Sequence, residues 1–153
     1  GQAIAWNEQA AGFTAESRGI RYICPVNDQL VWAIAYDGSG SQATIQEFTR
    51  TTNGGNTWNP GTVSGLSGYG LSMVCAINDT VAWIPAYGPS GGGKIMKTTN
   101  GGSTWTAQTT AAFSAPDGFP NAVHFWDANN GWCMGDPNGG YFEMYTTTDG
   151  GTN

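Results

Sequence analysis

Hydrophobic residues along this chain fall in short stretches separated by turn residues, without the 3.6-residue period of a helix. The stretches at 20–26, 71–77 and 121–126 are apolar at many consecutive positions. Continuous apolar runs of this length are typical of strands that are buried on both faces. Asn and Asp follow each stretch, which predicts tight turns between antiparallel strands. The pattern therefore predicts an all-β chain.

One pattern of about eight residues occurs three times. Thr51–Trp58 reads TTNGGNTW, Thr98–Trp105 reads TTNGGSTW, and 147–153 reads TTDGGTN. The second copy follows the first by 47 residues, and the third follows the second by 49. A tryptophan marker recurs with nearly the same period, at Trp32, Trp83 and Trp132. Such a period indicates a repeat architecture.

Each repeat has room for four strands: an apolar strand, a Trp strand, a third strand, and a fourth that opens with Trp. Four short antiparallel strands in about 40–50 residues are the signature of a β-propeller blade. We expect blade 1 at 19–63, blade 2 at 70–112, and a truncated blade 3 at 119–153. Residues 1–12 are expected to be the outer strand that closes the last blade. Because a ring needs at least about four blades, the chain should supply about three blades of a larger propeller.

Composition and charge exclude several function classes. The 153 residues include 24 Gly and 7 Trp, only 10% are charged, and the net charge is −6. A negative balance gives no electrostatic footprint for nucleic acid or an anionic membrane, and no apolar run is long enough for a spanning helix. The chain begins GQAIAW, without Met or a basic region. We expect a secreted or cell-surface protein whose signal has been removed, with no nucleic-acid partner and no membrane insertion.

The repeated pattern resembles the Asp-box, or BNR repeat, of sialidases, sortilin-type propellers and propellers similar to photosystem II assembly factors. Asn or Asp accepts backbone N–H groups in a tight turn, Gly supplies a positive φ, and Trp pins the turn to the blade. The resemblance implies a structural role, on the face away from the usual ligand site. The positions that fill the pattern are Thr51, Asn53, Gly55, Thr57, Trp58, Thr98, Asn100, Gly102, Thr104, Trp105, Thr147, Asp149 and Gly151.

Catalysis is the rival to binding, because the Asp-box family includes glycoside hydrolases. Glycoside hydrolysis needs two positioned carboxyl groups, and sialidases add an arginine cluster. The chain has three arginines, Arg18, Arg21 and Arg50. Arg50 and Lys97 occupy equivalent places, each immediately before a repeated turn, so we expect Arg50 to lie in a strand. We therefore expect that no arginine triad can be assembled.

Other candidate chemistry has simpler explanations. Asp117 and Asp136 could form a catalytic pair, but two acids in loops are expected by chance. His124 holds a strand position and reads as a core imidazole. The calcium-loop-like Asp127–Gly131 lacks a closing acid, since Asn138 stands in its place. We therefore expect no catalytic residue, no metal and no cofactor.

The candidate binding surface is the rim formed by the turns between second and third strands and by the blade connections. Tyr36 and Tyr87 are equivalent, each four residues after its blade Trp. They could form a stacking platform for a glycan or peptide, although packing at strand ends is the favoured alternative. The candidate binding residues are Tyr36, Tyr69, Tyr87, Asp117 and Asp136.

Two smaller features concern modification and redox state. Asn78-Asp79-Thr80 fits the N-x-T acceptor motif, and the overlapping Asp79-Thr80-Val81 resembles O-glycosylation sites of some secreted bacterial proteins. Asn78 and Thr80 are therefore possible glycosylation sites, unless the triplet is a plain turn. Three widely spaced cysteines are expected to be buried thiols: Cys24, Cys75 and Cys133.

We favour a secreted, non-catalytic β-propeller that serves as a surface binding, adhesion or assembly module. Its partners would be proteins or glycans at the cell surface, or copies of itself, and it resembles propellers exported by the type IX secretion pathway. The alternative is the N-terminal part of an Asp-box glycoside hydrolase of sialidase or xyloglucanase type, with catalytic residues mostly beyond residue 153. A chaperone resembling photosystem II assembly factors would need a basic patch on one rim, which the acidic balance argues against.

Overall fold

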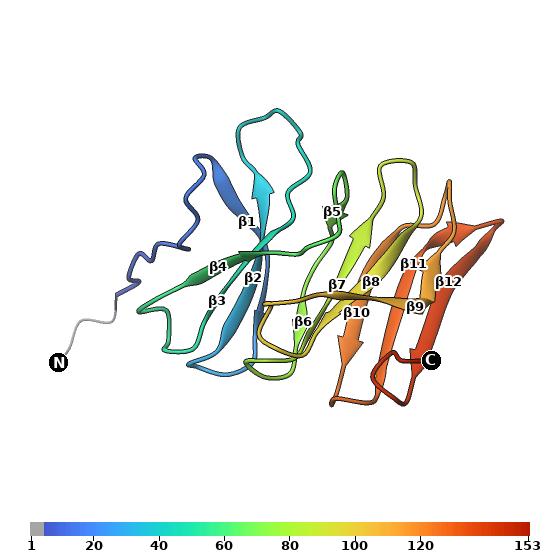
Figure 1. Ribbon diagram of the computed structural model, residues 1–153. Coiled ribbons are helices and arrows are strands. Elements are labelled where there is room, and N and C mark those ends of the chain that lie inside the picture. Colours follow the sequence, from blue (N-terminus) through green and yellow to red (C-terminus); the bar gives the residue numbers. More distant parts are fainter. Residues whose placement is uncertain (1–4) are drawn as a thin grey trace.

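The computed structural model describes residues 5–153 as three consecutive antiparallel sheets (Figure 1). Blade 1 holds β1 (Arg18–Pro25), β2 (Val31–Asp37), β3 (Glu47–Thr51) and β4 (Asn59–Thr62). Blade 2 holds β5 (Gly70–Leu71), β6 (Cys75–Ala76), β7 (Ala82–Tyr87), β8 (Gly93–Thr98) and β9 (Thr106–Phe113). Blade 3 holds β10 (Pro120–Phe125), β11 (Gly131–Asn138) and β12 (Tyr141–Thr147). The described residues contain no helix, and hence none that could cross a membrane.

The strand register repeats from blade to blade. In each blade the first strand pairs with the second, the second with the third, and in blades 1 and 2 the third pairs with a fourth. In blade 2 the two short strands β5 and β6 share the place of the first strand, and both pair with β7. The residue eight positions before each marker tryptophan lies directly opposite it: Cys24 opposite Trp32, Cys75 opposite Trp83, and His124 opposite Trp132.

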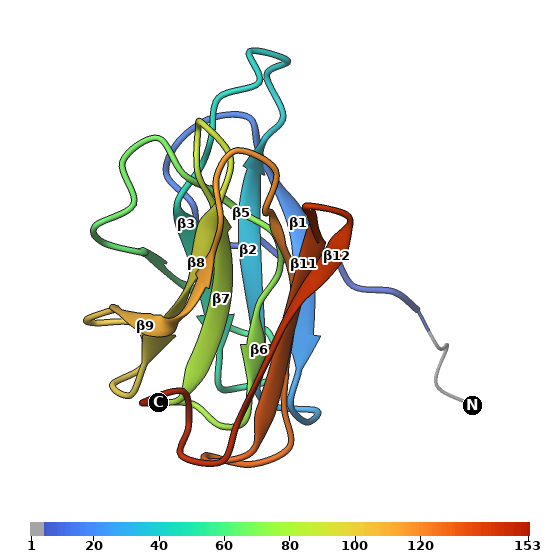
Figure 2. The same ribbon diagram turned by 90° about the vertical axis from the view of Figure 1, so that its right-hand side faces the viewer.

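The hydrophobic core lies between the sheets, which stand one behind another when viewed from blade 3 (Figure 2). The central strand β7 shows why its sequence is apolar on both faces. Ala82 and Ile84 belong to the cluster shared with blade 1, whereas Trp83 belongs to the cluster shared with blade 3. Because side chains alternate along a strand, a sheet between two others must be apolar on both sides.

The repeated turns have nearly identical hydrogen bonds, as their sequences indicate. In the first, the Thr51 hydroxyl accepts from the Gly55 N–H at 2.9 Å, and Asn53 Oδ1 accepts from the Thr57 N–H at 2.9 Å. The second turn repeats both bonds at 2.9 Å with Thr98 and Asn100 as acceptors. The side chains of these turns therefore supply the bonds that hold the chain reversal in place.

The outward faces of the first and third blades differ from the sequence expectation. The apolar stretch at 20–26 is expected to be buried on both faces, but Ile20, Tyr22 and Ile23 are exposed. In blade 3 the marker Trp132 is 44% exposed, while Trp32 and Trp83 are fully buried. The expectation fails at these positions because no further sheet covers either end of the described stack.

The expected outer strand at 1–12 is only partly described, and its first four residues lie outside the described part. Residues 5–12 pair with no strand of the described chain. Their expected partner is a further blade that is not among the described residues, so the outer strand at 1–12 stays a prediction. A strand needs a neighbour for its backbone bonds, and this segment lies beside side chains of blade 1. The Thr49 hydroxyl donates to the Ala11 carbonyl at 2.8 Å, and Gln9 Nε2 donates to the Gly54 carbonyl at 3.4 Å.

Candidate functional site

The five candidate binding residues lie at one end of the blades, which we call the loop rim (upper rim in Figure 1). Tyr36 is the penultimate residue of β2, Tyr87 ends β7, and Asp136 lies near the end of β11. Tyr69 precedes β5, and Asp117 lies in the β9–β10 connection. The β2–β3, β7–β8 and β11–β12 turns all belong to this rim, so the loop rim draws residues from all three blades.

Tyr36 and Tyr87 have equivalent packing roles. Each ring covers a glycine on the paired strand, Gly19 for Tyr36 and Gly70 for Tyr87, so that a side chain at either glycine would overlap the ring. No direct ring contact joins the two tyrosines within the described residues. Tyr87 instead stacks on Phe119, which immediately precedes β10, with ring centroids 4.4 Å apart and planes 22° from parallel. A role for the tyrosines in binding stays a prediction.

The structure adds two cations to this aromatic surface. The Arg21 guanidinium lies over the Tyr87 ring, 5.9 Å from its centroid, and Lys94 Nζ lies 4.7 Å from the centroid of Tyr69. Arg21 comes from blade 1, Tyr87 from blade 2 and Phe119 from the start of blade 3. We call Arg21, Tyr69, Tyr87, Lys94 and Phe119 the rim cluster.

The sequence analysis named Tyr69 and Tyr87 but missed the two cations of the rim cluster, because each cation is distant in sequence from the ring that it contacts. Arg21 has no basic counterpart in blade 2, where Ser72 stands at the matching place. Lys94 follows a glycine-rich turn and carries no motif. One signal in the sequence could have pointed to these cations. Only five Lys and Arg occur, and two of them lie immediately before the repeated turns, so only three remain as candidates for contact with a ligand.

Those two cations, Arg50 and Lys97, are used inside the blade stack. Arg50 lies 5.4 Å from the Trp32 ring centroid, and Lys97 lies 5.2 Å from that of Trp83. Lys97 Nζ also donates to the Gly150 carbonyl at 2.8 Å, and burial lowers the pKa of Lys97. The prediction that Arg50 occupies a strand position like Lys97 agrees with these contacts.

The other charges of the loop rim leave Arg21 and Lys94 free to meet a ligand. Within residues 5–153 the one ion pair joins Arg18 and Glu47. Asp136 accepts a hydrogen bond from Asn121, and no hydrogen bond joins it to Asp117 within the described part of the chain. Arg21 and Lys94 can therefore donate to a carboxylate beside an aromatic face.

The opposite end of the blades, which we call the turn rim, carries the repeated turns and the possible glycosylation residues. Asn78 and Thr80 are exposed in the β6–β7 turn. Asn78 Oδ1 accepts from the N–H groups of Thr80 and Val81 at 2.9 and 2.7 Å, which is the geometry of a tight Asx turn. Glycosylation at Asn78 or Thr80 stays a prediction.

A carboxylate of the third repeated turn has a lowered pKa. The Asn153 amide donates to Asp149 Oδ2 at 2.9 Å, and this bond, with the Thr147 hydroxyl at 2.8 Å, lowers the pKa of Asp149 to about 2. The ordinary value is about 3.9. The stabilising contribution of the ionised form is therefore present above about pH 4 and is lost as the pH falls towards the folded-state pKa.

We expect an NMR titration of the Asp149 carboxyl carbon to give a midpoint near 2. In an Asn153→Ala variant, which removes the principal donor, the midpoint should rise towards the ordinary value of about 3.9. Thr148→Ala, at the exposed neighbouring position, is the matched control and should leave the midpoint unchanged. A midpoint near 4 in the unsubstituted chain would contradict the hydrogen bonding described here.

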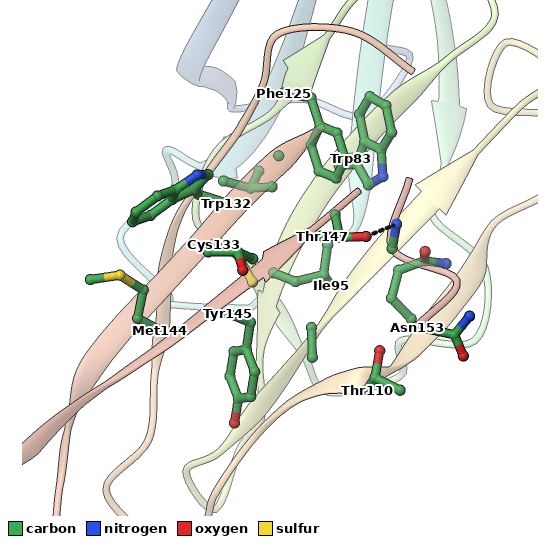
Figure 3. A pocket seen from close by; sticks show the side chains of 16 residues that line it. Trp83, Ile95, Thr110, Phe125, Trp132, Cys133, Met144, Tyr145, Thr147 and Asn153 are labelled. Carbon is green, nitrogen blue, oxygen red and sulfur yellow. Dashed lines mark hydrogen bonds between the residues drawn. The ribbon is translucent and has the colours of Figure 1, made fainter. Parts of the chain in front are cut away.

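A pocket of about 250 Å³ opens between blades 2 and 3 (Figure 3). Trp83 and Ile95 line it from blade 2, and Phe125 and Tyr145 line it from blade 3. Phe125 stacks flat on Trp83, with centroids 3.6 Å apart. The lining is mainly apolar. The volume of the pocket lies below the range of about 300–1,000 Å³ that is usual for small-molecule sites.

The cysteines and the histidine offer no assembled catalytic centre. Cys75 and Cys133 are buried as expected, but Cys24 is only half-buried, and all three are free thiols. The Cys75 thiol lowers the pKa of Cys24, while burial raises that of Cys133 to about 11. Within residues 5–153, no group of His, Cys, Asp and Glu could hold a metal ion.

The prediction that His124 is a buried core imidazole is wrong. It is exposed on β10, where its ring meets the edge of Trp126 at a centroid distance of 4.9 Å. The reason is the alternation of side chains along β10. Val123 and Phe125 face the core shared with blade 2, so the residue between them must face outward.

Comparisons with known proteins identify the fold. No protein-family model matches the sequence, and no curated protein is similar to it. A solved structure described as YCF48 bound to D1 peptide matches 99% of this chain with a TM-score of 0.63 and 20% identity. YCF48 from Cyanidioschyzon merolae matches 94% with a TM-score of 0.60 and 20% identity. The chain is a partial β-propeller, and it spans 44% and 40% of these two chains.

Proposed function

We propose that this protein is a non-catalytic binding module that takes up a segment of another protein at its loop rim. The observation that carries the proposal is the rim cluster, in which Arg21 of blade 1 lies beside the Tyr87 ring of blade 2, and Lys94 lies beside the Tyr69 ring of its own blade. A surface of this kind is suited to a flexible chain, because the rings pack against side chains while the cations fix a carboxylate.

The structural neighbour supports a peptide as the ligand class. That protein is described as bound to a D1 peptide, and the likeness extends over almost the whole of this chain. Arg21 and Lys94 supply positive charge at this rim beside the acids Asp37, Asp117 and Asp136, so a carboxylate would be bound by these two local cations and not by a basic patch. We infer a ligand segment that combines a carboxylate with an aromatic or aliphatic side chain.

The proposal also covers the location of the protein and the family to which its repeated turns belong. We propose that the repeated turns are Asp-boxes and that the protein acts outside the cell as a surface or assembly module. Support comes from the turn sequences, the low fraction of charged residues and the resemblance to type IX-exported propellers. Fractionation of the source cells tests the location, because a protein found wholly inside the cell would rule out the surface role.

A display library of random peptides with free carboxyl termini tests the rim cluster. We expect the chain to select peptides that contain a carboxylate next to an apolar residue. The double substitution Arg21→Ala and Lys94→Ala should weaken a selected peptide at least about ten-fold, because two charge-assisted contacts are lost. Gln29→Ala on the turn rim should not change the affinity. Equal binding to the double variant, or failure to select any peptide, would overturn the proposal.

A further inference from the structure

Several asparagines of this chain are followed directly by glycine, a pair that can modify itself. The pairs are Asn53-Gly54, Asn100-Gly101, Asn130-Gly131 and Asn138-Gly139. The backbone nitrogen of the glycine can attack the side-chain carbonyl carbon of the asparagine, because glycine has no Cβ to block the approach. The reaction requires a free side-chain amide, a free glycine N–H and a backbone with room to turn. These conditions separate the four pairs.

The first two pairs are held by the repeated turns. Asn53 Oδ1 accepts from the Thr57 N–H at 2.9 Å, and its amide nitrogen donates to the Thr57 hydroxyl at 2.9 Å. The Gly54 N–H donates to the Gln29 carbonyl at 3.0 Å, so the attacking nitrogen is engaged as well. The Asn100-Gly101 pair makes the equivalent bonds at the second turn. Neither of these pairs has a free amide or a free glycine N–H.

The third pair is held by an aspartate and by its strand. The Asn130 amide nitrogen donates to both carboxylate oxygens of Asp127, at 3.1 and 2.9 Å. Gly131 begins β11 and pairs with Phe125 on one side and Thr147 on the other. The side chain and the backbone of this pair are therefore both fixed.

The fourth pair lies at the tip of the β11–β12 hairpin, on the loop rim (Figure 1). Asn138 ends β11 and pairs with Tyr141, which leaves Gly139 and Gly140 as a two-residue turn. Within residues 5–153, no hydrogen bond holds the Asn138 amide and none engages the Gly139 N–H. The two glycines have φ values of +62° and +88°, and no atom beyond their chain neighbours lies within 4 Å of an added methyl group. This tip therefore has room for the attack.

The corresponding turn of blade 2 shows that such a tip stays exposed when the blade has its fourth strand. Asn138 lies six residues after Trp132, and Pro89 lies six residues after Trp83. Blade 2 has its fourth strand, β9, yet Pro89 and the serine that follows it are exposed. A fourth strand beside β12 would therefore leave the tip at Asn138 open to water.

We propose that Asn138 is a self-modifying site, at which the chain converts this asparagine to aspartate or isoaspartate by deamidation. The Gly139 nitrogen gives its proton to water or hydroxide and bonds to Cγ of Asn138, while the bond from Cγ to Nδ2 breaks. Ammonia leaves, and a cyclic succinimide remains. Water then adds to either carbonyl carbon of the ring and opens it. Overall, water is consumed and ammonia is released, so the reaction needs no oxidant or reductant.

Both products change the loop rim. The new carboxylate adds one negative charge to the net charge of −6. Isoaspartate also lengthens the backbone by one carbon atom at the last pair of the β11–β12 ladder, where Asn138 meets Tyr141. We expect that pair to open in the isoaspartate form, with loss of hydrogen-exchange protection at the Tyr141 amide. The site does not involve the rim cluster, so its test is independent of the proposed function.

Peptide mapping by mass spectrometry tests the proposal on the folded chain. The chain would be kept at mildly alkaline pH, and the loss of asparagine from each pair would be followed with time. Asn138 should react at least about ten-fold faster than Asn53, Asn100 or Asn130, because the hydrogen bonds of those amides must open first. In urea, where the turns are unfolded, all four sites should react at similar rates. A rate at Asn138 in the folded chain no greater than at the other three sites would overturn the proposal.

Two substitutions separate this site from other asparagines. Asn138→Gln should abolish the fast reaction, because glutamine would have to close a larger ring. Asn59→Gln should leave it unchanged, since Asn59 is followed by Pro60, which has no N–H to attack. An isoaspartyl methyltransferase with a labelled methyl donor measures the isoaspartate formed. Labelling that continues at the same rate in Asn138→Gln would also overturn the proposal.

Discussion

Replacement of Trp32 by alanine should lower the free energy of unfolding by about 3–5 kcal/mol, the usual cost of removing a large aromatic side chain from a core. Trp32 is fully buried, stacks on Phe48 at a centroid distance of 5.6 Å, and donates its indole N–H to the Asn78 carbonyl at 3.1 Å. The substitution would leave a cavity between blades 1 and 2. Urea unfolding followed by far-UV circular dichroism measures the loss.

The chain supplies its own control for this prediction. Trp132 holds the equivalent position in blade 3 but is 44% exposed, because no further sheet covers it. Trp132→Ala should therefore cost about 1 kcal/mol or less, as is usual for a surface substitution. Equal losses for the two variants would contradict the packing of blade 1 against blade 2.

Gly102→Ala should lower the free energy of unfolding by about 2–4 kcal/mol, since a left-handed backbone and an overpacked core both add cost. Gly102 has a φ of +88°, and an added methyl group would overlap the Phe48 ring. That ring is held between Trp32 and Trp105 and cannot turn away. The same urea experiment measures the change.

Gly140→Ala separates backbone strain from overlap. Gly140 has the same φ of +88°, but nothing lies within 4 Å of an added methyl group. We expect only the cost of the left-handed conformation, about 1–2 kcal/mol. The difference between the two variants then reports the contact with Phe48, and a zero difference would show that the ring does not pack against the second repeated turn.

The sequence predicts the strands well because the repeats constrain one another. The equivalence of Trp32, Trp83 and Trp132 follows from spacing alone, and the structure places each of them opposite the residue eight positions earlier. The turn bonds are predictable for the same reason, since Thr, Asn and Gly at fixed offsets can satisfy only a few backbone groups. Because the same turn residues recur with a constant period, few assignments of strands and turns fit the whole chain.

The exposure of side chains and the residues of the candidate site are harder to predict from the sequence, because both depend on which faces of the blades pack against each other. The apolar residues Ile20 and Tyr22 read as buried, yet they lie on an uncovered face of blade 1. The contact of Arg21 with Tyr87 joins two blades, so no local pattern encodes it. The pocket forms between two blades, with Trp83 and Tyr145 on opposite sides, so no local pattern in the sequence predicts it.

The central claim is that a protein segment binds at the loop rim, and an amide NMR titration tests it most directly. A peptide selected by display would be added to the isotope-labelled chain, and shifts of the backbone amides would be mapped. We predict the largest shifts around Arg21, Tyr69, Tyr87, Lys94 and Phe119. Shifts confined to the repeated turns of the turn rim, or to the pocket beside β12, would contradict this account.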